Sequence, residues 1–279
     1  MCLIGVAWKA HPDFPLIVAA NRDEYHARAA APSGWWSAVP QLLAGRDLQS
    51  GGTWMGVTRS GRFAALTNYR DAGEFNPGAP SRGALVADFL AGSATPDAYT
   101  AARGADAACY NGFNLLAGTP DALWYCGNRG AVPAALQPGI YGISNALLDT
   151  PWPKVIALKS ALGAALGLAV SEDPLQSRVF GPSVVRIEAL FDTLFEALCN
   201  TRAAADALLP RTGVPLERER ILSSAMIVSP LYGTRASTVL CMTRDGSVCW
   251  EERSVTPEGA VAHIVREQFS LGQGFAKIR

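Results

Sequence analysis

The chain has 279 residues, of which 49% are hydrophobic and 17% charged, and its 24 basic and 24 acidic residues give no net charge. This size and apolar content exclude a disordered or fibrous chain and predict one folded domain over residues 1–279. Because the charges cancel and no run of Lys or Arg occurs, the sequence offers no electrostatic footprint for nucleic acid or for an anionic membrane surface. We expect a small-molecule partner instead.

The first residues do not have the pattern of an export signal. The apolar run at residues 3–6 has no basic residue ahead of it, and polar residues soon interrupt the sequence that follows it (Lys9, His11 and Asp13). Nowhere does the chain carry the roughly 18 consecutive apolar residues that a membrane-spanning helix needs. We therefore expect a cytoplasmic protein with no membrane span.

Strand patterns dominate the first quarter of the chain. Short apolar runs predict strands at residues 2–8, 16–20, 53–58 and 62–67, with a turn at Ser60–Gly61 between the last two.

The middle of the chain mixes both kinds of element. Helical patterns cover residues 83–90 and 97–103, and strand patterns cover residues 113–117, 122–126 and 139–144.

Two longer helices and a second group of strands follow. Apolar residues recur at three- and four-residue spacing over residues 183–198, which predicts a helix with one core face, and a less regular pattern predicts a helix at 153–166. The chain closes with predicted strands at 225–229, 237–243 and 248–253 and a helix near the carboxyl terminus. Strands at both ends with helices between them favour an α+β fold in which helices cover the sheets.

The cysteines are scattered without C-x-x-C pairs, so they predict neither a zinc site nor a disulfide framework. A two-residue loop at Asp245–Gly246 would set Cys241 opposite Trp250, with Cys249 on the other face of the sheet and no bridge between the thiols. The histidines (His11, His26 and His263) lack partners at ligand spacing, and no metal site is predicted.

Cys2 is the exception among the cysteines. A small second residue normally permits removal of the initiator Met, which would leave Cys2 with both a thiol and a free α-amine. The amine titrates near 8 and the thiol near 8.5, so the amine is able to accept the thiol proton at neutral pH. The alternative interpretation is a small apolar residue that fills space in a buried strand.

A polar string follows the predicted strand at residues 16–20, namely Asn21-Arg22-Asp23-Glu24. Such residues after a strand are typical of a turn, because Asn and Asp bond to their own backbone. Two strands joined by a loop would also return this string to the side of Cys2. A carboxylate there would hold the ammonium form of the amine.

Cys2 together with Asn21-x-Asp23 resembles the cysteine N-terminal-nucleophile amidases, such as penicillin V acylase and bile salt hydrolase. The full Asn-Arg-Asp-Glu string, with Gly45-Arg46-Asp47 and the Gly-Gly-Thr-Trp-Met-Gly-Val segment at 51–57, is more closely similar to the NRDE family, also called the transport and Golgi organisation 2 family. The resemblance implies a four-layer αββα sandwich of two antiparallel sheets flanked by helices.

The amidase resemblance also implies roles for single residues. Cys2 corresponds to the nucleophile and Asp23 to the carboxylate near its amine, while Asn68 and Asn145 match positions near the oxyanion and the substrate. Supporting or substrate-binding roles are implied for the rest of the polar string and for a late arginine (Asn21, Arg22, Glu24 and Arg235). Ala20 departs from the pattern, since these amidases often carry Arg there.

Three functions remain open from the sequence. The first is a cysteine hydrolase acting on an amide or thioester of a small apolar substrate. The second is a non-catalytic protein that binds or carries haem or a lipid-like ligand, as the family resemblance implies; the sequence itself has no C-x-x-C-H or Cys-Pro haem motif. The third is a scaffold for protein partners. No cofactor is expected, and haem enters only as cargo.

Overall fold

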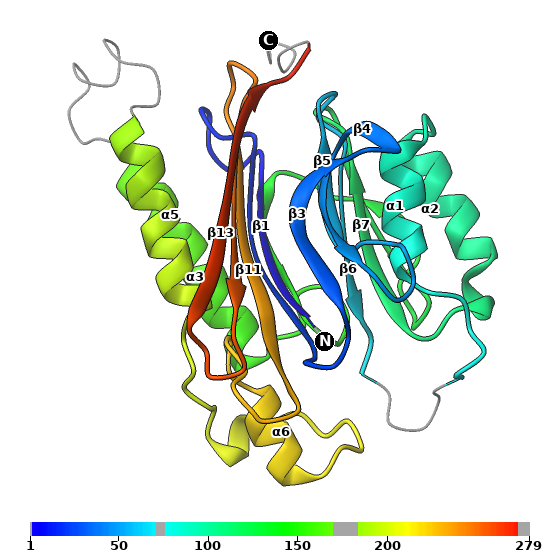
Figure 1. The fold of residues 1–279 in the computed structure, drawn as a ribbon, viewed down its shortest axis with the longest axis vertical. Coiled ribbons are helices and arrows are strands. Elements are labelled where there is room, and N and C mark those ends of the chain that lie inside the picture. Colours follow the sequence, from blue (N-terminus) through cyan, green and yellow to red (C-terminus); the bar gives the residue numbers. More distant parts are fainter. Residues whose placement is uncertain (1, 71–75, 170–183, 273–279) are drawn as a thin grey trace.

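The computed structural model describes residues 2–70, 76–169 and 184–272. In this part of the chain, two antiparallel sheets are stacked face to face, with helices on the outer face of each (Figure 1). The predicted α+β class and the αββα layering are therefore confirmed.

The first sheet has the order β10-β1-β2-β11-β12-β13 within the described residues. Its strands are β1 (Cys2–Trp8), β2 (Leu16–Tyr25), β10 (Gly139–Ile143), β11 (Tyr232–Met242), β12 (Ser247–Val255) and β13 (Val261–Ser270). β1 and β2 are interior strands, which places Cys2 and the Asn-Arg-Asp-Glu string inside the sheet.

The second sheet contains the strands from the first half of the chain, in sequence order from β3 to β9. They are β3 (Ala30–Trp36), β4 (Val39–Asp47), β5 (Met55–Thr58), β6 (Phe63–Asn68), β7 (Phe113–Gly118), β8 (Leu123–Gly127) and β9 (Ala134–Ala135). Its outer face is covered by α1 (Gly83–Ala91) and α2 (Pro96–Ala105).

The outer face of the first sheet is covered by α3 (Pro153–Ala169) and α5 (Val184–Leu198), while α6 (Leu216–Leu222) lies at one end of the molecule. The predicted stripe on α5 is confirmed as a core face, because its apolar side chains are buried against this sheet (Leu190, Phe191, Leu194, Phe195 and Leu198). Strands β1 and β2 alternate between this layer and the layer between the two sheets, and both layers are apolar.

Of the two interpretations of the polar string, the return to the side of Cys2 is the one observed, because β2 continues through the string to Tyr25 and forms no turn there. Three other predicted features of the local structure were wrong or incomplete. Residues 225–229 form no strand. Side chains bind part of their backbone, since Ala225 O accepts from Asn21 and Ile227 N donates to Thr234 Oγ1, and main-chain groups bind the rest, since Met226 N donates to Asn200 O and Ile227 O accepts from Thr234 N. The expected carboxyl-terminal helix is the edge strand β13, and β3 and β4 were not predicted.

The β11–β12 hairpin corrects the predicted cysteine register. Thr243 N donates to Ser247 O, and Gly246 has a φ of 87°, so the connection is a type I turn followed by a left-handed residue and is longer than two residues. This connection pairs Cys241 directly with Cys249, and the two thiols face the same side of the sheet. Both are free, as predicted.

A pair of glycines allows α3 to approach the first sheet closely. Gly5 on β1 lies directly opposite Gly142 on β10. A Cβ at Gly5 would lie 2.7 Å from Leu162 Cδ1, and one at Gly142 would lie 2.6 Å from Val155 Cγ1. Leu162 and Val155 both belong to α3. The close approach of this helix therefore depends on the absence of side chains at Gly5 and Gly142.

We predict that Gly5→Ala destabilises the protein by about 1 to 3 kcal/mol, because the added methyl group overpacks the interface with α3. Urea denaturation measures the change. Gly34→Ala on β3 is the matched control, since a Cβ there has no neighbour within 4 Å. If Gly5→Ala unfolds at the same urea concentration as the control, the close packing of α3 is not required.

Candidate active site

Strand alternation divides the polar string into two faces. Cys2 lies directly opposite Arg22 in the β1–β2 register. Side chains two positions apart on a strand face the same side of the sheet. Ile4 and Ala20 belong to the layer between the sheets, so Cys2, Arg22 and Glu24 face this side as well. Asn21 and Asp23 face the side of α3 and α5.

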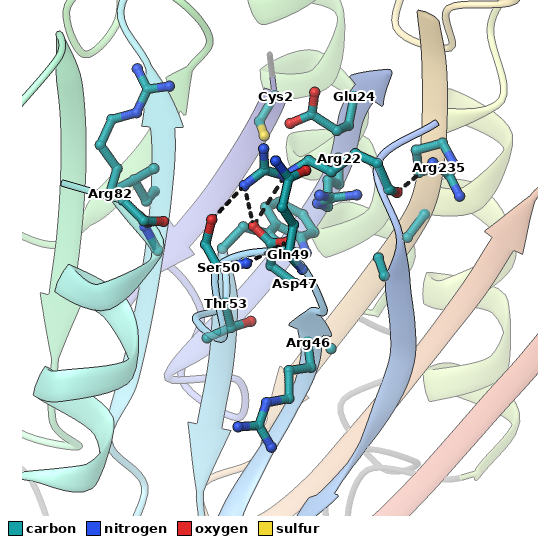
Figure 2. A pocket seen from close by; sticks show the side chains of 18 of the residues that line it. Cys2, Arg22, Glu24, Arg46, Asp47, Gln49, Ser50, Thr53, Arg82 and Arg235 are labelled. Atoms are coloured by element: carbon teal, nitrogen blue, oxygen red, sulfur yellow. Dashed lines mark hydrogen bonds and ion pairs between the residues drawn. The ribbon is translucent and has the colours of Figure 1, made fainter. Parts of the chain in front are cut away.

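A cleft of about 620 Å³ opens at one end of the space between the sheets, and Cys2 lines it. In Figure 2 the Cys2 side chain points into this cleft beside Glu24. The lining combines charged with apolar side chains: the arginines are Arg22, Arg28, Arg46, Arg82 and Arg235, and the apolar residues include Trp54, Leu66, Pro77 and Pro80.

The Cys2 thiol is mostly shielded from solvent, with 7% of the residue exposed. Burial raises the pKa of this thiol, and the nearby Asp23 carboxylate raises it further, while Arg22 and the main-chain N–H of Asp23 lower it. Since burial dominates, the thiol needs an adjacent base to become a thiolate at neutral pH.

Asn68 and Asn145 lie next to each other, but only Asn68 lines the cleft with Cys2, so the expected place of Asn145 near the substrate is not observed. Asn68 ends β6 and lines the cleft with Cys2. Asn145 is buried behind it: its Nδ2 donates to Asn68 O at 2.8 Å, and its Oδ1 accepts from Ser144 Oγ. Ser144 also donates to Cys2 O at 3.0 Å. The backbones of Cys2 and Asn68 are thus joined through Ser144 and Asn145.

Asn21 and Asp23 are both buried, but they bind different parts of the structure. Asn21 donates to Leu198 O and Ala225 O and accepts from Ser237 Oγ, so this side chain fixes β2 to the segments around it. Asp23 Oδ1 accepts a 2.7 Å bond from Thr234 Oγ1 on β11. Burial raises the pKa of the Asp23 carboxyl, and Lys154 is the charge that opposes this rise most strongly.

Arg235 lies at an irregularity in the β2–β11 pairing and lines the cleft. One guanidinium nitrogen donates to the main-chain oxygens of Tyr25, His26 and Arg28. Arg235 therefore fixes the loop that follows β2, in addition to any contact with a ligand.

Arg82 was not predicted as a site residue. It precedes α1, lines the cleft, and donates from one guanidinium nitrogen to Gly112 O. Burial lowers the pKa of Arg82, and the nearby Cys2 and Glu24 oppose this shift. Figure 2 shows Arg82 on a different wall from Cys2. No sequence pattern joins these residues, because Cys2 begins β1 and Arg82 precedes α1, 80 positions later in the chain.

A buried set of charges behind Cys2 was also missed. Arg70 and Glu219 form an ion pair whose side chains are 5% and 2% exposed. Lys154, at the start of α3, is buried near them and near Asp23. The sequence did contain a signal for Lys154, since it precedes Leu158 and Leu162 at four-residue spacing and so continues the buried stripe of the helix.

Among the described residues, no group of His, Cys, Asp and Glu side chains is close enough to hold a metal ion. The described residues that line the cleft include no His, Met or Tyr. Of the side chains that commonly bind haem iron, Cys2 is therefore the one present among them. The described helices include none that is long and apolar enough to cross a membrane.

Two stacked antiparallel sheets covered by helices, with a cysteine that begins an interior strand and lines a cleft, are the arrangement that the resemblance to the N-terminal-nucleophile amidases implied. The chain belongs to the Transport and Golgi organisation 2 family, whose profile matches residues 1–257. The family that the sequence resembles is thereby confirmed.

The chain is similar to the Transport and Golgi organization protein 2 homolog of Bos taurus, with 36% identity over 271 residues, which cover 91% of this chain and 93% of the relative. A Caenorhabditis elegans N-acylethanolamine-hydrolyzing acid amidase ortholog is similar in structure, with 11% identity, a TM-score of 0.43 and coverage of 86% of this chain and 92% of that one. Penicillin V acylase from Agrobacterium tumefaciens has 11% identity, a TM-score of 0.42 and coverage of 100% and 94%.

We predict that Arg70→Met destabilises the protein by about 3 to 5 kcal/mol, because it leaves the buried Glu219 carboxylate without its ion-pair partner. Chemical denaturation at pH 7 measures this loss. Arg220→Met is the control: Arg220 pairs with Asp206 on the surface, and solvent screens that pair. Equal effects of the two variants would contradict the structural importance of the buried pair.

Proposed function

We propose that this protein is an N-terminal cysteine hydrolase that acts in the cytoplasm on an amide or thioester of a small apolar substrate, after removal of the initiator Met exposes the amine of Cys2. The observation that carries this proposal is the arrangement around Cys2: the thiol lines the cleft, and the Asp23 carboxylate is buried on the opposite face of the adjacent strand. The side chain of Cys2 therefore points into the cleft, while the Asp23 carboxylate lies on the other side of the sheet, behind the main chain of Cys2.

In the proposed reaction, the α-amine of Cys2 accepts the thiol proton and the thiolate attacks the carbonyl carbon of the substrate. A carbon–sulfur bond forms, and the carbonyl electron pair moves to oxygen. The Asp23 carboxylate holds the ammonium ion while it forms. When the oxyanion collapses, the bond to the leaving amine or thiol breaks, and the ammonium returns its proton to that group.

The product of this first half is an acyl-cysteine thioester. Water, deprotonated by the same amine, attacks the thioester and releases the acid and the free thiol. Asn68 is proposed to donate its amide N–H to the oxyanion in both halves, a contribution worth about 3 to 4 kcal/mol for one donor in known cases. Asn145 would support it by fixing the main chain of Asn68.

A binding or carrying role for haem or a lipid-like ligand is the second candidate. The family name denotes transport rather than hydrolysis. The cleft also suits an amphipathic cargo, since charged side chains of both signs and apolar side chains line it together, with Arg28 paired to Asp47. In this role Cys2 would be an unactivated thiol, so its reactivity separates the two functions.

The hydrolase proposal predicts that protein made in its native host lacks the initiator Met, because the Cys2 side chain is small enough for the aminopeptidase. Intact-protein mass spectrometry, with sequencing of the amino-terminal peptide, measures this directly. Cys2→Leu is the control, since a large second side chain should keep Met1. Full retention of Met1 in the wild-type protein would exclude the amine of Cys2 as the base.

The proposal further predicts that Cys2→Ala lowers turnover of a panel of amides and thioesters by at least about a thousandfold, because the covalent step is lost. Its free energy of unfolding should change by only about 1 kcal/mol, which denaturation measures alongside the rates.

Iodoacetamide labelling supplies a test that needs no substrate. At pH 7, Cys2 of the wild-type protein should react faster than the exposed Cys109 and Cys199, whose thiols lack an adjacent base. Peptide mass spectrometry gives the relative rates. A protein with neither turnover nor faster labelling of Cys2 would contradict the hydrolase proposal.

A further inference from the structure

Lys154 occupies a position that is unfavourable for a lysine on two counts. Only 4% of the residue is exposed, and removal of an ammonium group from water is costly. It is also the second residue of α3, where the positive end of the helix dipole repels a cation. A buried lysine at such a position needs compensation from specific neighbours.

One neighbour is the carboxyl-terminal end of α6. Lys154 Nζ donates to Leu222 O at 2.9 Å, and Leu222 is the last residue of that helix, where a cation is favoured. The segment that follows Leu222 leads directly to Asp23: Ile227 N donates to Thr234 Oγ1, which in turn donates to Asp23 Oδ1. The same short segment, residues 222–227, thus binds Lys154 at one end and, at the other end, binds Thr234, which donates to Asp23.

The glycine pair opposite α3 explains how the lysine reaches this depth. Because Gly5 and Gly142 have no side chains, the first turns of α3 lie directly on β1 and β10. β1 begins at Cys2, and β2 carries Asp23 beside it. Close packing of the helix therefore delivers its first-turn lysine beneath the same strand ends.

The charged and titratable groups that face Lys154 come from every element around it. They are Asp23 on β2, Cys2 on β1, Arg70 after β6 and Glu219 on α6. Burial lowers the pKa of Lys154 to about 8, and Asp23 is the neighbour that opposes this most strongly. In turn, Lys154 is the charge that most opposes the upward shift of the Asp23 pKa. Arg70, which is paired with Glu219, also opposes the upward shift of the Asp23 pKa, but less strongly than Lys154 does.

We infer that Lys154 is a positioning residue that keeps the Asp23 carboxylate ionised at neutral pH, so that Asp23 holds the amine of Cys2. The second half of this inference rests on the proposed hydrolase function, whereas the first half concerns only the two buried side chains. Lys154 does not touch the substrate; it acts through Asp23.

The direction of the pH effect follows from the two charges. Below about pH 8, Lys154 is an ammonium ion and favours the carboxylate form of Asp23. Without that cation, burial acts on Asp23 with less opposition, and its pKa rises further. Loss of an opposite charge at close range corresponds to a shift of about one to three units.

The test is a carbon-13 NMR titration of the aspartate carboxyl groups in the full-length protein, with the Asp23 signal assigned by its loss in Asp23→Asn. We expect Lys154→Met to raise the pKa of Asp23 by about one to three units and Lys154→Arg to restore it. Lys159→Met is the matched control on the same helix, because Lys159 is paired with Asp149 at the surface. An unchanged Asp23 titration in folded Lys154→Met overturns the inference.

Folding of the variants supplies a second readout. If Lys154→Met does not fold, the double variant Lys154→Met with Asp23→Asn should fold, because it removes the buried carboxylate that has lost its most strongly opposing charge. Failure of the double variant as well would show that Lys154 serves something other than Asp23, and would overturn the inference.

Labelling of Cys2 at pH 7 connects the inference to the proposed function. We expect roughly ten- to a hundredfold slower labelling in Lys154→Met and recovery in Lys154→Arg, because the amine loses its fixed partner. Wild-type protein without selective labelling would contradict the hydrolase function, while the Asp23 titration would still decide whether Lys154 sets its charge. A third outcome is that Lys154→Met changes the pKa of Asp23 but leaves the labelling rate of a reactive Cys2 unchanged. Lys154 would then only stabilise the buried Asp23, and its positioning role would be overturned.

Discussion

The continuation of β2 through four polar residues is the constraint on which the rest of the structure depends. An interior strand must satisfy every buried polar group, and this strand carries Asn21 and Asp23 into the layer beneath α3 and α5. Asn21 is satisfied by the end of α5, by Ala225 and by Ser237, and Asp23 by Thr234. These bonds fix the positions of α5, of the segment before β11 and of β11 itself. The polar string thus organises the end of the first sheet before it contributes to any chemistry.

The same strand geometry separates the reactive groups onto two sides. The side chains of Cys2, Arg22 and Glu24 face the cleft between the sheets, whereas strand alternation turns the Asp23 side chain toward the helices, although Asp23 is itself among the residues that line the cleft. A carboxylate on the helix side does not compete with a substrate for the thiol, but it is able to act on the main-chain nitrogen of Cys2. This separation suits a nucleophile and a base that belong to one residue, and it explains why the lining of the cleft and the charges behind it have to be considered separately.

Burial of charge links the site to the stability of the fold. The region behind Cys2 contains Asp23 and Glu219 together with Arg70 and Lys154, so acids and bases balance there. Each of these groups is costly to remove singly, because its partner would remain charged in a low-dielectric interior. Replacement of one member is therefore expected to change both the free energy of unfolding and the charge state of the groups near Cys2.

The sequence by itself determined the fold class, the core face of α5, the strand that begins at Cys2 and the family to which the chain belongs, because these depend on local periodicity and on contiguous motifs. The family resemblance also pointed to Asn68, which lines the cleft, and to Asn145, which lies behind it and binds the main chain of Asn68. The tertiary structure alone decided that the polar string is an interior strand, that residues 225–229 are irregular, and that Cys241 faces Cys249. It alone brought Arg82, Lys154 and the Arg70–Glu219 pair to the site. The physical reason is that these features depend on partners distant in the chain: whether a polar residue turns or stays in a strand is set by the side chains available to bind it, and local propensity carries no information about them.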